Sequence, residues 1–241
     1  MKSLLDHFCS LMKTASYAIA LTALVIYGST GPTPPAQSAS IDMKRPGATH
    51  PQPPPELLPR EKEIELALSA APEHLRNGAG IYVLERTGFV KVRESANGFT
   101  CIVNRDHPLN QKPVCFDAEG TATILPKILR VGELLMQGRA MSEINAEIEE
   151  GFRSGKYISP RRAGVAYMLS GDIRNYNSRT GKVESFPPHI MFYAPNVANA
   201  DLGTTPEALA KDPSLPFVAY QGPHGFIIML AGDKQKIAMQ H

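Results

Sequence analysis

The sequence has no tryptophan and no strong excess of charge of either sign. Its 241 residues include 25 lysines and arginines against 23 aspartates and glutamates, and 43% of the residues are hydrophobic. A protein whose main function is to bind a polyanion carries a clear positive excess, so this balance argues against a nucleic-acid partner. The composition is that of a soluble protein. The chain is long enough for one large domain or two small ones.

The sequence also lacks the short motifs of several enzyme classes. It contains no G-x-S-x-G, H-E-x-x-H, G-x-x-x-x-G-K-[ST], G-x-G-x-x-G or C-x-x-C pattern. These motifs position a nucleophile, a zinc ion, a phosphate, a dinucleotide or a redox pair. Their absence removes the usual sequence evidence for each of those enzyme classes. No residue pattern names a cofactor or a substrate.

Residues 1–39 have the layout of a secretory signal peptide. Lys2 and Lys13 precede an uncharged apolar run at residues 15–27, and small residues such as Ala36 and Ser38 follow it. The run is shorter than the roughly 20 residues of a membrane-spanning helix and suits the hydrophobic region of a signal peptide. The alternative is an uncleaved N-terminal anchor, which would be the protein's one membrane contact. Either way we expect the folded part to be secreted or periplasmic.

Residues 40–59 are predicted to be a proline-rich linker. Nine of the 21 prolines fall between residues 31 and 59, and few large apolar residues accompany them. Proline fixes φ and removes a hydrogen-bond donor, so this stretch favours an extended spacer. A ligand for an aromatic groove of another protein is the alternative.

Residues 60–241 are predicted to form one α+β domain. A helix is expected between Pro59 and Pro72, followed by a hairpin of residues 81–84 and 89–93 and by a third strand at residues 99–103. The alternation of apolar and polar residues in these strands predicts an antiparallel meander.

Two amphipathic helices and a second group of strands follow. The first helix is expected to start near Pro126 and to end at Gly138, and Ser142 is expected to cap the second. Further strands are expected at residues 163–169, 190–193, 217–220 and 226–230, with a short helix at residues 205–210. Strands, then helices, then strands again predict a largely antiparallel sheet with helices packed on one side.

Cys101 and Cys115 are the two cysteines that remain after removal of the signal peptide. In an oxidising compartment an even pair of thiols predicts a disulfide, here one that closes a short loop. The alternative is a pair of reduced, buried thiols. Asp106 and His107 lie inside this loop and can supply an acid or a base, although Asp and His before proline are also ordinary turn residues.

His189, His224 and Asp201 are the candidate catalytic residues. Each histidine stands at the entrance of a predicted strand and directly follows a proline, and His224 also precedes Gly225. If the two strands are neighbours, we expect the imidazoles to meet at one rim of the sheet, with Asp201 orienting one of them or completing a metal site. The simpler alternative is that both rings bind nearby backbone groups.

Four further residues are candidate ligand-binding residues. Asn196 and Asn199 offer amide groups near Asp201, and Arg161 and Arg162 form a basic pair suited to a carboxylate or phosphate. Turn and surface positions are the alternative for all four.

Three functions from different classes are compatible with these features. The first is an exported α+β domain that binds a small molecule or a protein partner. The second is a hydrolase-like enzyme in which His189 or His224 acts as a base, with backbone donors near Gly222 and Gly225 stabilising negative charge. The third is a split-barrel binder of flavin or haem, suggested by the strand meander alone.

Overall fold

The computed structural model describes residues 50–232, so the predicted signal peptide at 1–39 lies outside the described residues, as does the first half of the predicted linker. The strands are β1 (Gly80–Glu85), β2 (Gly88–Arg93), β3 (Thr100–Asn104), β4 (Lys112–Phe116), β5 (Val165–Met168), β6 (Arg174–Asn177), β7 (Lys182–Ser185), β8 (His189–Tyr193), β9 (Phe217–Val218) and β10 (Phe226–Leu230). The helices are α1 (Arg60–Ser69), α2 (Glu73–Arg76), α3 (Ala118–Thr123), α4 (Leu125–Met136), α5 (Met141–Arg153), the 3-10 turn η1 (Asn199–Leu202) and α6 (Pro206–Lys211).

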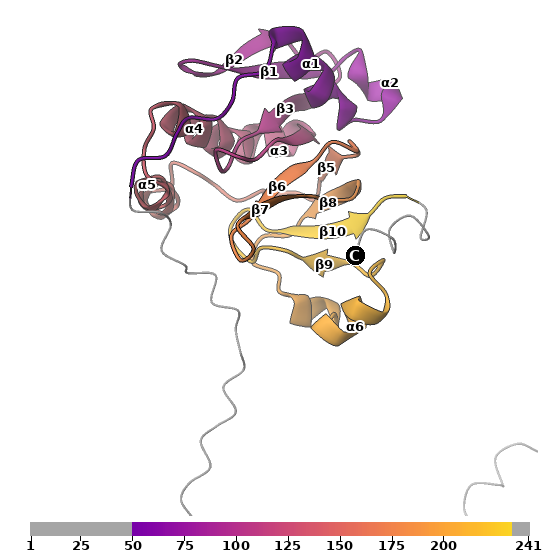
Figure 1. Cartoon of the computed structure of the whole chain (residues 1–241). Coiled ribbons are helices and arrows are strands. Elements are labelled where there is room, and N and C mark those ends of the chain that lie inside the picture. The colour runs from indigo at the N-terminus through magenta and orange to yellow at the C-terminus, as the bar shows by residue number, and fades with distance from the viewer. Residues whose placement is uncertain (1–49, 233–241) are drawn as a thin grey trace, which may run out of the picture. The chain divides into compact units, whose positions relative to one another are not determined.

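An eight-stranded sheet, in the order β2-β1-β3-β4-β5-β8-β10-β9, forms the centre of the fold (Figure 1). All neighbouring strands pair antiparallel except β1 and β3, and β6 and β7 form a separate hairpin. The prediction of a mixed fold with a large, mostly antiparallel sheet is confirmed. Figure 1 shows β1, β2 and α1 at one end of the domain and β9, β10 and α6 at the other.

The predicted meander is wrong at its third strand, because β3 pairs with β1 in parallel. The loop after β2 is bound to the start of β1: Ala96 N donates to Gly78 O at 2.7 Å, and Gly80 N donates to Phe99 O at 2.8 Å. The Asn97 side chain adds a 2.8 Å hydrogen bond to Leu75 O. These bonds return the chain to the point where β1 begins, so β3 runs in the same direction as β1.

Helices cover both faces of the sheet, which corrects the expectation of helices on one side. Alternate residues of β3 show the two faces. Cys101 and Val103 pack with Ala67 of α1 and with the two alanines that follow the helix, whereas Ile102 packs with Ile128 of α4. Successive side chains of a strand point to opposite faces. The central strands are apolar at consecutive positions, so burying them requires a cover on each side.

The face under α1 is closely packed with small side chains. Ala67, Ala70 and Ala71 are fully buried against Cys101 and Cys115. Small residues let a helix approach a sheet closely and leave no free volume.

The opposite face is covered by α3 and α4. Gly132 of α4 lies so close to Phe89 of β2 that an added Cβ would stand 2.3 Å from the ring. The short helix α3 was not predicted, because its sequence AEGTAT has weak helix propensity. It is fixed by Asp117, whose Oδ1 accepts from Gly120 N at 2.9 Å and from the Tyr193 hydroxyl at 2.7 Å.

The predicted pair of Cys101 and Cys115 is bonded in the structure. The two residues are direct register partners on β3 and β4, with their Cα atoms 4.0 Å apart. The bridge therefore closes the base of the hairpin loop that carries Asp106. It lies on the α1 face, because both cysteines pack there.

The described part of the predicted linker, residues 50–59, has no helix or strand. Pro55 in this segment is nevertheless buried, and an added Cβ on Gly138 would lie 3.4 Å from Gln52 O. This part of the linker thus contacts the domain. Among residues 50–232, no helix combines the length and apolar composition that a membrane crossing requires.

Glu63 of α1 and Arg105, which follows β3, form a buried ion pair at 2.9 Å with side chains 2% and 1% exposed. Arg105 Nη1 also donates to Val103 O at 3.1 Å. Burial raises the pKa of Glu63 despite the neighbouring guanidinium. The pair joins α1 to the sheet at the cost of desolvating two charges.

We expect Arg105→Met to lower the free energy of unfolding by about 3–5 kcal/mol, because it leaves the Glu63 carboxylate buried without its partner. The double variant Glu63→Leu/Arg105→Met should lose less than this single variant, since no buried charge remains. Urea unfolding at neutral pH measures both. Additive losses in the double variant would contradict the argument.

Candidate functional site

A cavity of about 470 Å³ lies on the α4 face of the sheet. Most of its lining is apolar. Val114 and Phe116 of β4 and Met191 of β8 contribute from the sheet, and Ile128 and Val131 contribute from α4. Cavities of this size are large enough for a small organic ligand.

The cavity opens beside the loop that connects β9 to β10. Ala219 and Tyr220 are exposed yet also line the cavity, so they stand where it meets solvent. Tyr220 lies over Gly222, where an added Cβ would approach the tyrosine ring to 2.5 Å. The glycine therefore permits this position of the ring.

Asp106 is the carboxylate of the cavity and is held by two partners. Its Oδ1 accepts from Asn110 Nδ2 at 2.6 Å, and its Oδ2 forms a short ion pair with Lys112 Nζ. Burial alone would raise the pKa of Asp106, but the charge and hydrogen bond of Lys112 outweigh it and the pKa is lowered. Asp106 is thus an anion whose charge is balanced by Lys112.

Lys127 is a second cation of the same cavity. It lies one turn before Val131 on α4, within an apolar stripe. Burial lowers the pKa of Lys127; Asp106 opposes this effect and Lys112 adds to it. No ion pair or hydrogen bond of Lys127 is found among residues 50–232.

His189 lines the cavity and is 3% exposed. Its Nδ1 lies 2.8 Å from Pro187 O, and a carbonyl oxygen only accepts, so Nδ1 carries the proton. Nε2 is then an acceptor. Burial lowers the pKa of His189, although the bond to Pro187 opposes this.

His224 also lines the cavity and is 2% exposed. Its Nε2 donates to Ile158 O at 2.9 Å, which leaves Nδ1 as the acceptor nitrogen. Burial lowers the pKa of His224 to about 4, so the ring is neutral at pH 7. Nδ1 has no partner among the described residues, and neither has the buried Oδ1 of Asn104, which lines the same cavity.

The two histidines do not meet at one rim. Their strands are neighbours, as expected, but β8 and β10 pair antiparallel, with His189 opposite Leu230 and Tyr193 opposite Phe226. The entrances of antiparallel neighbours lie at opposite ends, and four residues of strand span roughly 14 Å. His189 and His224 therefore line one cavity from opposite ends.

Asp201 lies outside the cavity lining and closes a local turn. Its Oδ2 accepts from Ala198 N at 2.8 Å. The structure therefore does not place Asp201 in the cavity that the two histidines line. Gly225 N donates to Gly222 O at 2.9 Å, so the backbone donor expected near Gly225 is used within the loop.

The four predicted ligand-binding residues do not line the cavity, and each has a contact within the fold. Asn196 has a φ of +62° and its backbone N donates to Gly222 O at 2.8 Å. The Asn199 amide pairs with both backbone groups of Val218, at 2.6 and 2.9 Å. Arg161 N and Arg162 Nε both donate to the Glu119 carboxylate, and both arginines are exposed. Ligand binding by these residues stays a prediction.

The part of the chain that the structure describes contains no set of side chains that could bind the metal ion of a metal-assisted site. No three side chains of His, Cys, Asp or Glu within residues 50–232 could hold one metal ion together.

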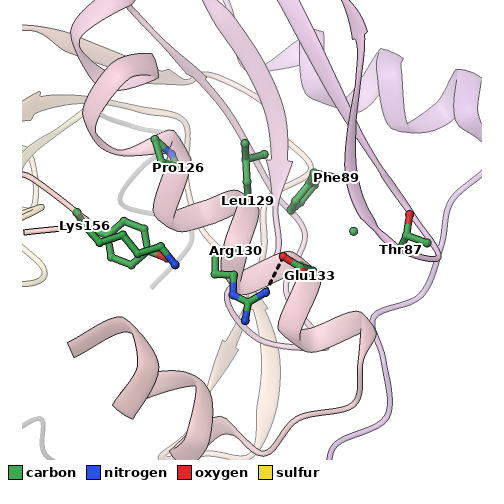
Figure 2. A pocket seen from close by; sticks show the side chains of 9 residues that line it. Thr87, Phe89, Pro126, Leu129, Arg130, Glu133 and Lys156 are labelled. Carbon is green, nitrogen blue, oxygen red and sulfur yellow. Dashed lines mark ion pairs between the residues drawn. The ribbon is translucent and has the colours of Figure 1, made fainter. Parts of the chain in front are cut away.

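A second hollow of about 360 Å³ lies between the β1–β2 turn and α4 (Figure 2). Arg130 is its prominent charge, but the guanidinium pairs with Glu133 at 2.8 Å and with Glu147 at 2.6 Å. Figure 2 shows Arg130 directed at Glu133 along the helix. Because the Arg130 guanidinium is already paired with two carboxylates, this hollow is a weaker candidate than the cavity.

The sequence indicated the two cavity histidines but not Lys112, Lys127 or Asn104. One signal could have found Lys127. Ile124, Lys127, Ile128 and Val131 recur at the i, i+3, i+4 and i+7 spacing of one helix face, and all four line the cavity. A lysine inside an otherwise apolar stripe of a helix indicates a polar group beside an apolar surface, and Lys127 is partly exposed here.

Comparisons of the chain with protein-family models, with curated proteins and with solved structures find no match. Function is therefore argued from the cavity itself.

We expect acid to destabilise the protein through His224. Its pKa is 6.5 unfolded and about 4 folded, so the stability present above pH 6.5 is lost as pH falls toward 4. Each pH unit in this interval removes about 1.4 kcal/mol. His224→Gln, which keeps a donor for Ile158 O and does not titrate, should flatten this part of the curve.

The measurement is urea unfolding at several pH values between 4 and 7. His74→Gln, at an exposed position, is the matched control. An unchanged slope in His224→Gln would show that another group carries the acid sensitivity.

Proposed function

We propose that this protein is an exported binding protein that holds a small, mostly apolar organic molecule in the cavity between α4 and the sheet. The apolar body of the ligand contacts Phe116, Ile128 and Met191. A polar end, with carbonyl or carboxylate oxygens, faces Lys112 and Lys127.

One observation carries this proposal: a single cavity combines an apolar wall with a small set of polar groups. Ligand sites in proteins are mostly apolar and use a few polar groups to orient the ligand. The unpartnered Nδ1 of His224 and Oδ1 of Asn104 support it further, because a buried acceptor without a partner costs about 1–3 kcal/mol. A ligand hydroxyl or amine donor would remove that cost.

The hydrolase alternative has weaker support. A base needs a residue that orients it and a nucleophile within hydrogen-bond reach. His189 and His224 approach the cavity from opposite ends of β8 and β10, and Asp201 lies outside the lining. Each histidine instead binds a backbone carbonyl.

Export is the second part of the proposal. The charge and hydropathy pattern of residues 1–39 supports it, and the bond between Cys101 and Cys115 is consistent with an oxidising compartment. A flavin or haem pocket has no separate support beyond the cavity's size.

We expect protein recovered from the periplasm or the culture medium to begin after residue 36, because export removes the signal peptide. Mass spectrometry without reductant should find the Cys101 and Cys115 peptides linked. Recovery of the intact N-terminus from the cytosol, with both thiols free, would oppose export.

We expect the purified protein to bind anilinonaphthalene sulfonate, a fluorescent probe with an apolar body and one anionic group, with one site per chain. Ala219→Trp should weaken binding at least tenfold, because the indole obstructs the opening while the position is exposed and tolerant. Ala96→Trp, at an exposed position away from the cavity lining, is the matched control. Equal binding by both variants would place the probe elsewhere.

A further inference from the structure

His224 offers a hydrogen-bond acceptor at one end of the cavity. The residue lines the cavity and is 2% exposed, and its Nδ1 is buried without a hydrogen-bond partner among the described residues. The other nitrogen, Nε2, donates to Ile158 O at 2.9 Å, which keeps the proton of the neutral ring on Nε2. In the neutral ring Nδ1 therefore accepts a hydrogen bond and cannot donate one.

The His224 ring is oriented by contacts outside the cavity. Ile158, which binds Nε2, does not belong to the cavity lining, and neither does Phe152, whose ring centroid lies 4.7 Å from that of the imidazole. The two nitrogens lie on different sides of an imidazole, so the side that carries Nδ1 is turned away from Ile158. This is the side of the ring that is left to line the cavity.

Asn104 is a less specific acceptor than His224. Its Oδ1 is also buried without a partner among the described residues, but rotation of the amide exchanges Oδ1 for the donor Nδ2. Asn104 can therefore serve either a donor or an acceptor on the ligand. The histidine has no such freedom, because Ile158 O requires the proton on Nε2. His224 thus specifies a hydrogen-bond donor on the ligand.

The sheet register places Lys112 and His224 at opposite ends of the cavity. Strand β5 ends at Met168, the register partner of His189, and β4 runs antiparallel to β5. Lys112, which begins β4, therefore lies at the His189 end. His224 precedes β10 at the other end, and the four residues of strand between the ends span roughly 14 Å.

The floor of the cavity between the two ends is apolar. Phe116, Met191 and Ile228 line the cavity and lie in one row across the sheet. A ligand that reaches both ends therefore has a long apolar middle and a polar group at each end. The group at the His224 end has to be a neutral donor, because burying a cation costs far more than burying a hydroxyl.

We propose that the cavity binds an elongated hydroxy acid, with its carboxylate toward Lys112, its apolar chain along Phe116 and Met191, and a terminal hydroxyl that donates to His224 Nδ1. This inference rests on the proposed binding function and adds the hydroxyl and its position. Burial lowers the pKa of His224 to about 4, so Nδ1 keeps its lone pair at pH 7, which supports the same conclusion.

The experiment compares 10-hydroxydecanoic acid with decanoic acid, which differ only in the terminal hydroxyl. Each acid is titrated at pH 7 into purified protein that holds anilinonaphthalene sulfonate, and displacement of the probe gives the dissociation constant. We expect the hydroxy acid to bind about threefold to tenfold more tightly, because its hydroxyl gains a hydrogen bond. Against an apolar wall the hydroxyl would lose its water partners and weaken binding. Equal or weaker binding of the hydroxy acid would overturn the proposal.

Two variants locate the hydroxyl through the ratio of the two dissociation constants. His224→Leu removes the acceptor, so the ratio should reverse in favour of decanoic acid. His224→Gln keeps a donor for Ile158 O and has a carbonyl oxygen of its own, so it should keep part of the preference. His74→Gln, at an exposed position outside the cavity lining, is the matched control and should keep the wild-type ratio. An unchanged ratio in His224→Leu would contradict the assigned contact.

A measurement on the wild-type protein follows the ring nitrogen itself. In protein labelled with nitrogen-15 histidine, 10-hydroxydecanoic acid should shift the Nδ1 resonance of His224 more than decanoic acid does, because only the hydroxyl donates. The spectrum of His224→Gln assigns this resonance. A shift confined to His189 would place the hydroxyl at the other end of the cavity and reject the proposal.

The outcomes separate this proposal from the proposed function. If decanoic acid displaces the probe and the hydroxy acid binds no more tightly, the hydroxyl contact is rejected and the binding function is kept. If neither the probe nor either acid binds, both are rejected.

Discussion

The ion pair between Asp106 and Lys112 is the interaction on which the candidate site depends. Lys112 and Asn110 hold the Asp106 carboxylate, which is 43% exposed, at the edge of the cavity. Asp106 and Asn110 lie on the loop between β3 and β4, and Lys112 begins β4. The bond between Cys101 and Cys115 closes the base of this loop on the other face of the sheet. The disulfide thus limits the movement of the loop without occupying any of the cavity.

The two faces of the sheet differ because their helices differ in side-chain size. Ala67 of α1 and the two alanines that follow the helix, Ala70 and Ala71, are fully buried against the sheet. On the other face, α4 approaches β2 at Gly132, where Phe89 fits against the helix backbone. Ile128 and Val131 of α4 line the cavity together with residues of β8 and β10.

Local patterns predicted most elements but not how distant elements pair. The hairpin β1–β2, the helix α4 and the strands β8 and β10 each follow from a periodicity within a few residues. The parallel pairing of β3 with β1 depends on bonds that the loop makes to residues 78–80, and no periodicity encodes them. For the same reason the sequence placed His189 and His224 at strand entrances correctly but did not give the direction of one strand relative to the other.

The polar groups of the cavity are arranged so that few of them are charged. Asp106 and Lys112 form an ion pair, and burial lowers the pKa of both histidines, which favours their neutral forms. Placing a bare ion in such surroundings would cost far more than placing a neutral, hydrogen-bonding group there. The polar end of a ligand therefore has to be neutral or to lie against the two lysines of the cavity lining, Lys112 and Lys127.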